Sequence, residues 1–174
     1  MRTFGDMLKS YHVGMSAAII DIRMSRTSDI TFNNKYQLIE DYDFFLKLLR
    51  QGNAYYDAMP LMKYRMHEAS LTNSSKKNWA VEFEMLYNDL TTTVLDVVEQ
   101  KEYASQLRWL RVRSVNARAE ELIRDGKRMS LLSLILKNCY LDLRLMFPLA
   151  YLAMSQKCYY KLKSKLLKTS YRVA

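Results

Sequence analysis

Three carboxylates stand close together in the stretch QLIEDYDFFLKLLRQG, residues 37–52: Glu40, Asp41 and Asp43. A positioned carboxylate can remove the proton of a hydroxyl group, so one of the three could serve as a general base. Acidic residues also favour the first turn of a helix, where free N–H groups and the positive end of the helix dipole stabilise anions. On this stretch alone, the helix-start interpretation is the stronger one.

The spacing of Asp41 and Asp43 also matches a D-x-D metal motif. Tyr42, Phe45, Leu46 and Leu49 recur at helical spacing, which predicts a helix from about Glu40 to Gln51 that ends at Gly52. Side chains two residues apart on a helix point about 200° away from each other, so they do not converge easily on one ion. We therefore reject a metal site at this D-x-D.

The elements around this cluster are predicted from the pattern along the chain. Residues 1–75 indicate a short helix at 3–10, a buried strand at 15–22, a loop at 25–35, the helix at 40–51, and two short strands within 54–59 and 61–67. The later residues indicate helices at 76–100, 102–125 and 129–168, the last interrupted by Pro148. We expect three parts: an α/β part at 1–75, a helical extension at 76–128 and a basic amphipathic tail at 129–174.

Composition limits the class of protein. The chain has 174 residues, 49% of them hydrophobic, with four glycines and two prolines, which favours one helix-rich domain or slightly more. Cys139 and Cys158 have neither disulfide nor metal-site spacing and are interpreted as reduced intracellular thiols. No apolar signal segment follows Met1, so we expect a cytoplasmic protein that is peripheral on the cytoplasmic face of a membrane.

Flanking segments give the acidic cluster a family context. SYHVGMSAAIID (10–21) precedes it and PLMKYRMHEASLT (60–72) follows it. Together with EDYDFFLKLL, this order resembles the C-terminal half of the catalytic domain of family 2 glycosyltransferases, which are inverting enzymes of the GT-A fold. The resemblance covers about residues 1–75. It implies an α/β fold class, with a partial GT-A mixed sheet in this region and a mostly helical C-terminal region.

The resemblance also implies roles for individual residues. The aspartate of the Glu40–Asp41 pair is the general base, and His67 of the Tyr-Arg-x-His segment helps to hold a metal and the diphosphate. Arg65 and the turn formed by Gly14, Met15 and Ser16 belong to the substrate cleft. The implied reaction transfers a sugar from a nucleotide-sugar donor to a glycan or lipid-linked acceptor. A divalent metal, Mn²⁺ or Mg²⁺, would neutralise the leaving diphosphate.

One half of the family pattern has no counterpart in the sequence. The nucleotide-binding sheet, with its own metal-binding D-x-D, normally precedes the part that this chain resembles. No alternating β–α pattern stands before Gly14. The sequence therefore predicts the C-terminal part of a split or truncated enzyme, which lacks most of the donor site and is inactive by itself.

The C-terminal region predicts a membrane-surface tether at residues 129–172. From Lys137 onward there are eight Lys and Arg residues against one acid, Asp142, which is most of the net charge of +9. Lys137, Asp142, Arg144 and Pro148 interrupt the apolar run, so a simple transmembrane span is not expected. The basic residues of 157–172 suit an anionic leaflet, with Tyr159, Tyr160 and Tyr171 as interfacial anchors. Packing on the chain's own core stays an alternative for 129–146.

Two other functions compete with the enzyme. One is a non-catalytic, basic helical protein that binds membrane surfaces. The other is a nucleic-acid binder, because tyrosine and lysine alternate in KCYYKLKSKLLKTSYR (157–172). No recognised nucleic-acid motif is present, so this interpretation ranks last and we expect no nucleic-acid partner.

Overall fold

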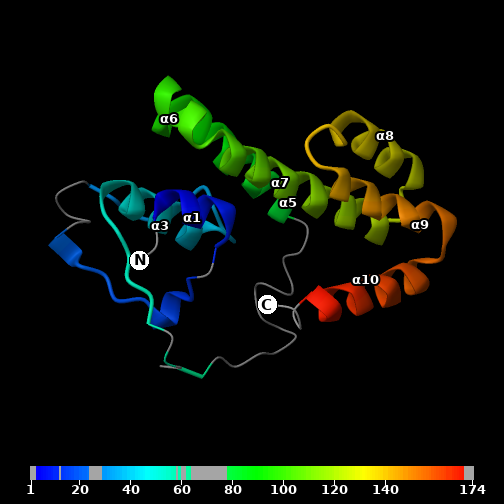
Figure 1. Cartoon of the computed structure of the whole chain (residues 1–174), viewed down its shortest axis with the longest axis horizontal. Helices are drawn as coiled ribbons and strands as arrows, with labels where there is room; N and C mark the ends of the chain where they lie inside the picture. Colours follow the sequence, from blue (N-terminus) through cyan, green and yellow to red (C-terminus); the bar gives the residue numbers. More distant parts are fainter. Residues whose placement is uncertain are drawn as a thin grey trace. The chain divides into compact units, whose positions relative to one another are not determined.

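The computed structural model describes residues 3–11, 13–23, 29–57, 59, 62–63 and 78–170. Within these ranges every regular element is helical, and there is neither a strand ladder nor a sheet (Figure 1). The expected α/β class, with a partial GT-A mixed sheet at 1–75, is therefore wrong. The described chain is all-α.

The predicted strand at 15–22 shows why that expectation failed. Met15–Ala17 form a single 3₁₀ turn, η1; after it Ile19 and Ile22 are 98% and 58% accessible, while Ala18 and Ile20 are partly buried against the core. An apolar run becomes a strand only when a neighbouring strand pairs its N–H and C=O groups. No such neighbour exists among the described residues. Residues 54–57 and 59 also lie outside any strand, and the predicted strand at 61–67 falls mostly outside the described residues.

The chain divides into two compact units, Met1–Ser114 and Val115–Ala174, and the boundary lies within helix α7 (Ala104–Arg124). The three-part division expected from the sequence stays a prediction. Each unit has its own buried residues and is described by itself below.

Unit 1 is built around helix α3, Glu40–Gln51, whose bounds agree with the sequence prediction. The helix is buried on almost every side, as expected of a central helix. Its buried residues are Tyr42, Asp43, Phe44, Phe45, Leu46, Leu48 and Leu49. The other helices of the unit are α1 (Phe4–Lys9), α5 (Trp79–Asp89), α6 (Val97–Glu102) and the first part of α7. Gly52 ends α3, as predicted, with an extended backbone, φ −166°.

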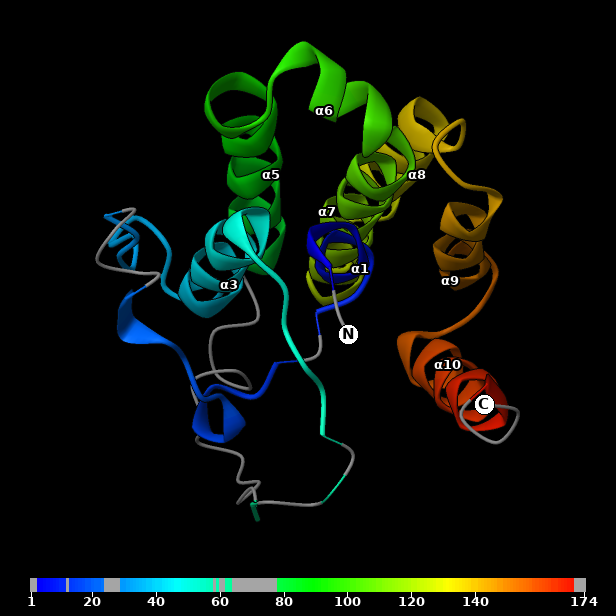
Figure 2. The ribbon, with the colours of Figure 1, turned by 60° about the vertical axis from the view of Figure 1, so that its left-hand side comes forward.

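Helices α5 and α7 form an antiparallel pair whose connection includes α6 (Figure 2). The hydroxyl of Ser114 donates to the carbonyl of Ala80 at 3.1 Å, and the Arg111 guanidinium lies 5.2 Å from the centre of the Tyr87 ring. These contacts hold the two helices together along their length.

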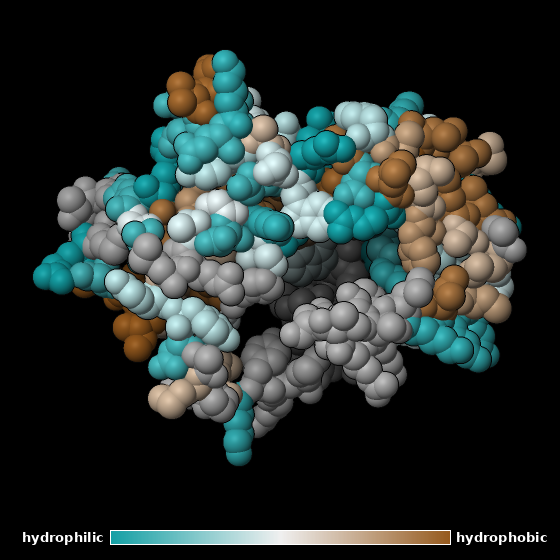
Figure 3. Space-filling view, viewed as in Figure 1, coloured by the Kyte–Doolittle hydropathy of each residue, from teal (hydrophilic) through white to brown (hydrophobic). Residues whose placement is uncertain are grey.

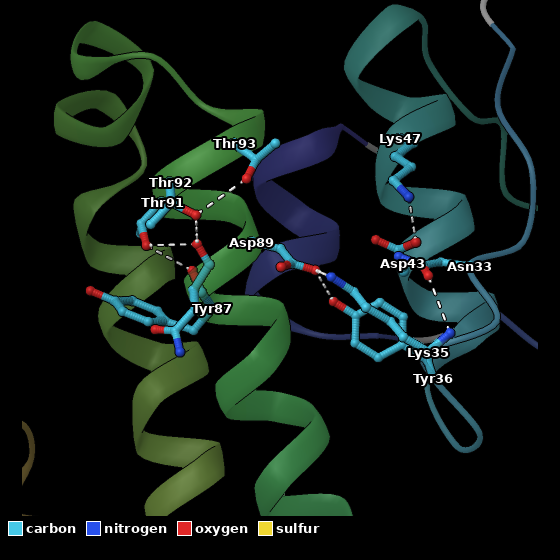
Figure 4. Close-up of polar contacts among 11 residues, drawn as sticks. Asn33, Lys35, Tyr36, Asp43, Lys47, Tyr87, Asp89, Thr91, Thr92 and Thr93 are labelled. Atoms are coloured by element: carbon cyan, nitrogen blue, oxygen red, sulfur yellow. Dashed lines mark hydrogen bonds and ion pairs between the residues drawn. The ribbon is translucent and has the colours of Figure 1, made fainter.

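The continuous helix predicted at 76–100 is interrupted by a π-helical turn, η2 (Leu90–Val94). The hydroxyls of Thr91 and Thr92 donate to the carbonyls of Tyr87 and Asn88, at 2.9 and 2.8 Å (Figure 4). Threonine side chains that bond to the preceding turn compete with the regular helical ladder. The chain then restarts as α6 at Asp96, whose carboxylate caps Val98 and Glu99.

Unit 2 contains the end of α7, α8 (Arg128–Asn138), the 3₁₀ segment η3 (Leu143–Leu149), α9 (Ala150–Ala153) and α10 (Gln156–Ser170). Gly126 ends α7 as predicted, with a positive φ of 71°. Pro148 lies within η3, which runs directly into α9, so the helical region is interrupted at residues 139–142 and 154–155 and not at Pro148 as predicted. No helix in the described part of the chain combines the length and the apolar character required to cross a lipid bilayer.

Candidate functional site

The start of helix α3 is capped by a residue from another helix. Glu82 of α5 is 5% exposed, and its carboxylate accepts backbone hydrogen bonds from Gln37, Leu38 and Ile39 at 3.2, 2.9 and 3.2 Å. Ile39, the N-cap residue itself, makes no side-chain cap. The anion that satisfies the N–H groups before α3 is therefore Glu82. The N–H groups of the first turn itself are a separate set, and one of them, that of Tyr42, is bonded by Asp41, so the helix-start explanation still applies to Asp41.

The three acids of the cluster have different environments. Asp43 is 4% exposed and accepts a hydrogen bond from the Lys47 ammonium at 2.6 Å (Figure 4). Asp41 is half-buried, and its Oδ1 accepts the N–H of Tyr42 at 2.7 Å. The Oε2 atom of Glu40 is buried and has no hydrogen-bond partner among the described residues. Asp41 and Asp43 thus do not share a site, in agreement with the helical-spacing argument.

Tyr11 joins Glu40 and Asp41 from the segment after α1. Its ring lies 4.8 Å from that of Tyr42, whose hydroxyl donates to the carbonyls of Met7 and Leu8. Burial raises the pKa of Tyr11 well above its ordinary value, and the adjacent carboxylates of Asp41 and Glu40 raise it further. The Tyr11 hydroxyl is also buried without a standard hydrogen bond in the described chain. A protonated phenol and two carboxylates therefore meet at the start of α3.

A hollow of about 380 Å³ lies in the same unit. Its lining comes from α1, from the segment after α1 and from the segment after α3: Asp6, Met7, Ser10, Val13, Ala54, Tyr55 and Tyr56. Two of these residues, Ser10 and Val13, stand on either side of Tyr11 in the sequence. Tyr55 and Tyr56 are 89% and 68% exposed, so two aromatic rings are accessible at its edge.

The remaining residues implied by the resemblance are only partly placed. Gly14, Met15 and Ser16 are exposed at η1 and at its N-cap. No hydrogen bond or ion pair of the described chain joins them to Glu40 or Asp41. Arg65 and His67 lie outside the described residues.

The expected metal depends on residues that the structure does not describe. Within the described ranges, no three His, Cys, Asp or Glu side chains come together in a way that could hold a metal ion. The ligand implied by the resemblance is His67. A Mn²⁺ or Mg²⁺ site therefore stays a prediction tied to that residue and to a nucleotide-binding half.

Two residues of the predicted membrane tether have partners within unit 2. The Lys163 ammonium donates to the Glu120 carboxylate at 2.5 Å. Tyr159 is 1% exposed and packs against the rings of Phe147 and Tyr151. Burial, followed by the Glu120 charge, raises the pKa of Tyr159. Both side chains thus contribute to the packing of α10 on unit 2, and Tyr171 and Arg172 lie outside the described residues.

Sequence reasoning assigned no role to Glu82 or Tyr11. For Glu82 a signal was present: it stands three residues after Trp79 and four before Leu86, which puts a carboxylate on the apolar face of its helix. An acid in such a position must find buried donors. For Tyr11 no comparable signal exists, because its neighbours are set by the tertiary fold.

Comparison with known proteins finds no matching family model, no matching curated protein and no matching solved structure. The resemblance to family 2 glycosyltransferases stays a prediction that rests on the quoted residues.

Proposed function

We propose that this chain supplies the general base and the acceptor side of an inverting glycosyltransferase that uses nucleotide-sugar donors. The observation that supports the proposal is the meeting of Glu40, Asp41 and the protonated Tyr11 phenol at the start of α3. Glu82 bonds the N–H groups of Gln37, Leu38 and Ile39, while Glu40 Oε2 is buried with no hydrogen-bond partner among the described residues. A buried carboxylate oxygen without a structural partner is a candidate for chemistry.

Asp41 is the proposed base. It is half-buried, so its carboxylate can meet an acceptor hydroxyl while it remains held by the N–H of Tyr42. Asp41 takes the proton of that hydroxyl as its oxygen attacks the anomeric carbon. The glycosidic bond forms while the bond from this carbon to the diphosphate breaks, and the diphosphate leaves with the electron pair. Tyr11 stays protonated at neutral pH and offers an O–H donor beside the base.

The hollow lined by Ser10, Val13 and the tyrosine pair is the proposed acceptor site. Tyrosine rings offer a flat apolar face with a polar edge, which suits the two-sided surface of a sugar ring. Asp6 and Ser10 add polar groups at the same hollow. We therefore expect the acceptor to be a glycan or a lipid-linked sugar.

The donor side is proposed to come from a nucleotide-binding half of the enzyme. A divalent cation bound there would neutralise charge on the leaving diphosphate, and His67 is the residue of this chain proposed to hold it. This part of the proposal rests on the resemblance alone.

The test is Asp41→Asn in the complete natural gene product, assayed for sugar transfer from a set of common nucleotide sugars. Asparagine keeps the size and the hydrogen bond but cannot take a proton, so turnover should fall by about a hundredfold or more. Donor binding, measured by calorimetry, should be unchanged. The matched control is Asp43→Asn, which removes the same charge two positions away. It should lower stability and leave turnover per folded molecule intact.

Two results would contradict the proposal. Wild-type turnover in the Asp41→Asn protein would remove Asp41 as the base. Absence of transfer from every nucleotide sugar tested, by a folded wild-type protein, would favour the non-catalytic alternative.

A further inference from the structure

Helix α8 of unit 2 carries a line of exposed apolar side chains. Met129 and Leu136 of α8 are 77% and 59% exposed, and Tyr140, in the turn after the helix, is 65% exposed. The spacing of seven residues places Met129 and Leu136 on one stripe of α8, opposite the fully buried Leu131 and Ile135. Leu143, 82% exposed, follows at the start of η3. We call Met129, Leu136, Tyr140 and Leu143 the α8 ridge.

The surface view agrees with this arrangement. Figure 3 shows hydrophobic residues gathered over the part of the molecule that carries α8. Side chains of this size are normally exposed singly, and a contiguous apolar group marks an interaction surface.

A cationic hollow of about 620 Å³ borders the ridge. Arg118, Lys127 and Lys137 line it together with the hydroxyl residues Ser130 and Ser133. Arg118 pairs with Glu121 and Lys127 with Asp125, whereas Lys137 has no ion pair among the described residues. Met129 belongs to both the ridge and the hollow lining. Apolar and cationic side chains therefore lie next to each other where Met129 lines the hollow.

The positive charge of α8 also favours an anionic partner. Its sequence, RMSLLSLILKN, contains Arg128 and Lys137 and no acid. An apolar stripe beside cations and hydroxyls matches the layers of a bilayer surface, where acyl chains lie beneath a sheet of phosphates. A protein partner with an apolar groove would not by itself call for cations along one side.

We propose that the α8 ridge and the adjoining hollow bind the surface of a bilayer that is rich in anionic phospholipid. The ridge enters the boundary between headgroups and acyl chains, and Lys137, Lys127 and Arg118 face the lipid phosphates. The helix lies on the membrane, since no described helix could cross it. This proposal does not depend on the glycosyltransferase function. It places the lipid contact on α8, and within 157–172 Lys163 and Tyr159 are engaged in unit 2.

The apolar part is tested by co-sedimentation of the full chain with vesicles of equal parts phosphatidylglycerol and phosphatidylcholine. The double variant Met129→Gln, Leu136→Gln should bind about tenfold more weakly, because two inserting side chains become polar. The matched control is Val97→Gln, Val98→Gln in unit 1, where the side chains are 67% and 73% exposed. That variant should bind like the wild type. Circular dichroism checks that both variants are folded.

The charged part is tested with single lysine variants. Lys137→Gln should weaken binding roughly fivefold, the effect expected for one cation at an anionic leaflet. Lys161→Gln in α10 removes the same charge from an exposed position away from the hollow and should have a smaller effect. Vesicles of phosphatidylcholine alone should bind weakly, and high salt should release the protein.

Several outcomes would overturn the proposal. One is unchanged vesicle binding in the Met129→Gln, Leu136→Gln variant. Another is a larger loss with Lys161→Gln than with Lys137→Gln, which would return the contact to α10. Binding of inorganic phosphate without binding of vesicles would make the hollow an anion site only. A wild-type dimer that the ridge variant converts to monomers would show that a second copy covers the ridge.

Discussion

The Glu82 carboxylate lies 2.9 Å from the backbone nitrogen of Leu38, two residues before helix α3 begins. The same carboxylate also accepts the N–H groups of Gln37 and Ile39. One buried side chain of α5 therefore binds the three residues that lead into a helix from a distant part of the sequence. This relationship joins α5 to the segment before α3, while Asp41 bonds the N–H of Tyr42 within the first turn.

Glu82→Gln should destabilise the protein by about 2 kcal/mol, since a neutral amide cannot accept three backbone N–H groups and hydrogen bonds to a charged group are the stronger ones. The measurement is the free energy of unfolding in urea. Glu84→Gln, an exposed position on the same helix, serves as the control and should change the free energy little. Equal stabilities of the two variants would mean that the Glu82 cap contributes nothing.

The ion pair of the buried Asp43 with the partly exposed Lys47 should behave as a coupled unit. Lys47→Met leaves Asp43, which is 4% exposed, without its cation and should cost about 3 kcal/mol. The double variant Asp43→Leu, Lys47→Met should be more stable than Lys47→Met alone, because no charge is then left buried. A double-mutant cycle of urea unfolding free energies measures the coupling. Additive effects would show that the two groups do not interact.

Acid should lower the free energy of unfolding of unit 1, because Asp89 becomes protonated. Burial opposes ionisation of this carboxyl, but hydrogen bonds from Lys35 and from the Tyr36 hydroxyl, seen in Figure 4, outweigh it and lower the pKa of Asp89 below the ordinary 3.8. The unfolded chain therefore takes up this proton first. The stability from the contact is complete above the ordinary pKa and is lost as the pH falls through the folded value.

The measurement is urea unfolding on both sides of pH 3.8, the ordinary aspartate pKa. Asp89→Asn should be less stable than the wild type at neutral pH and should lose less stability on acidification. Asp125→Asn, at a more exposed ion pair, is the control. If acid lowers the free energy of unfolding equally in the wild type and in Asp89→Asn, the lowered pKa of Asp89 does not contribute to the pH dependence of stability.

Gly126→Ala should destabilise unit 2 by about 1 kcal/mol through backbone strain. Gly126 has φ +71°, and a Cβ added there meets nothing within 4 Å, so steric overlap does not contribute. Gly126→Asn should cost less, because asparagine tolerates the left-handed region. Gly14→Ala is the control: φ is −84° and its surroundings are open, so the midpoint of thermal unfolding should not change. An unchanged midpoint for Gly126→Ala would contradict the strain argument.

Local signals in the sequence predicted several elements correctly. The spacing of Tyr42, Phe45 and Leu49 predicted α3 within its observed bounds. The short helix at 3–10 appears as α1, with Thr3 and Asp6 forming its capping box. These elements depend on residues within a few positions of one another, which is the range over which helical hydrogen bonds and caps act.

The site was predictable only in part, for the same reason. EDYD drew attention to Asp41 as a base, and helical spacing separated Asp41 from Asp43. The partners of these acids come from elsewhere in the chain: Tyr11 from the segment after α1, Glu82 from α5. Contacts between residues so far apart in the chain produce no periodic pattern that can be recognised in the sequence.

By itself, then, the sequence determined the bounds of α1, α3 and α7 to within a few residues and the distribution of positive charge along the chain. Those properties follow from propensity, capping and composition, which are local. Only the tertiary structure decided that the apolar run at 15–22 is not a strand, because a strand needs a partner to satisfy its backbone. It also decided that Glu82 binds the segment before α3 and which residues of α8 face outward, because burial depends on how helices pack together.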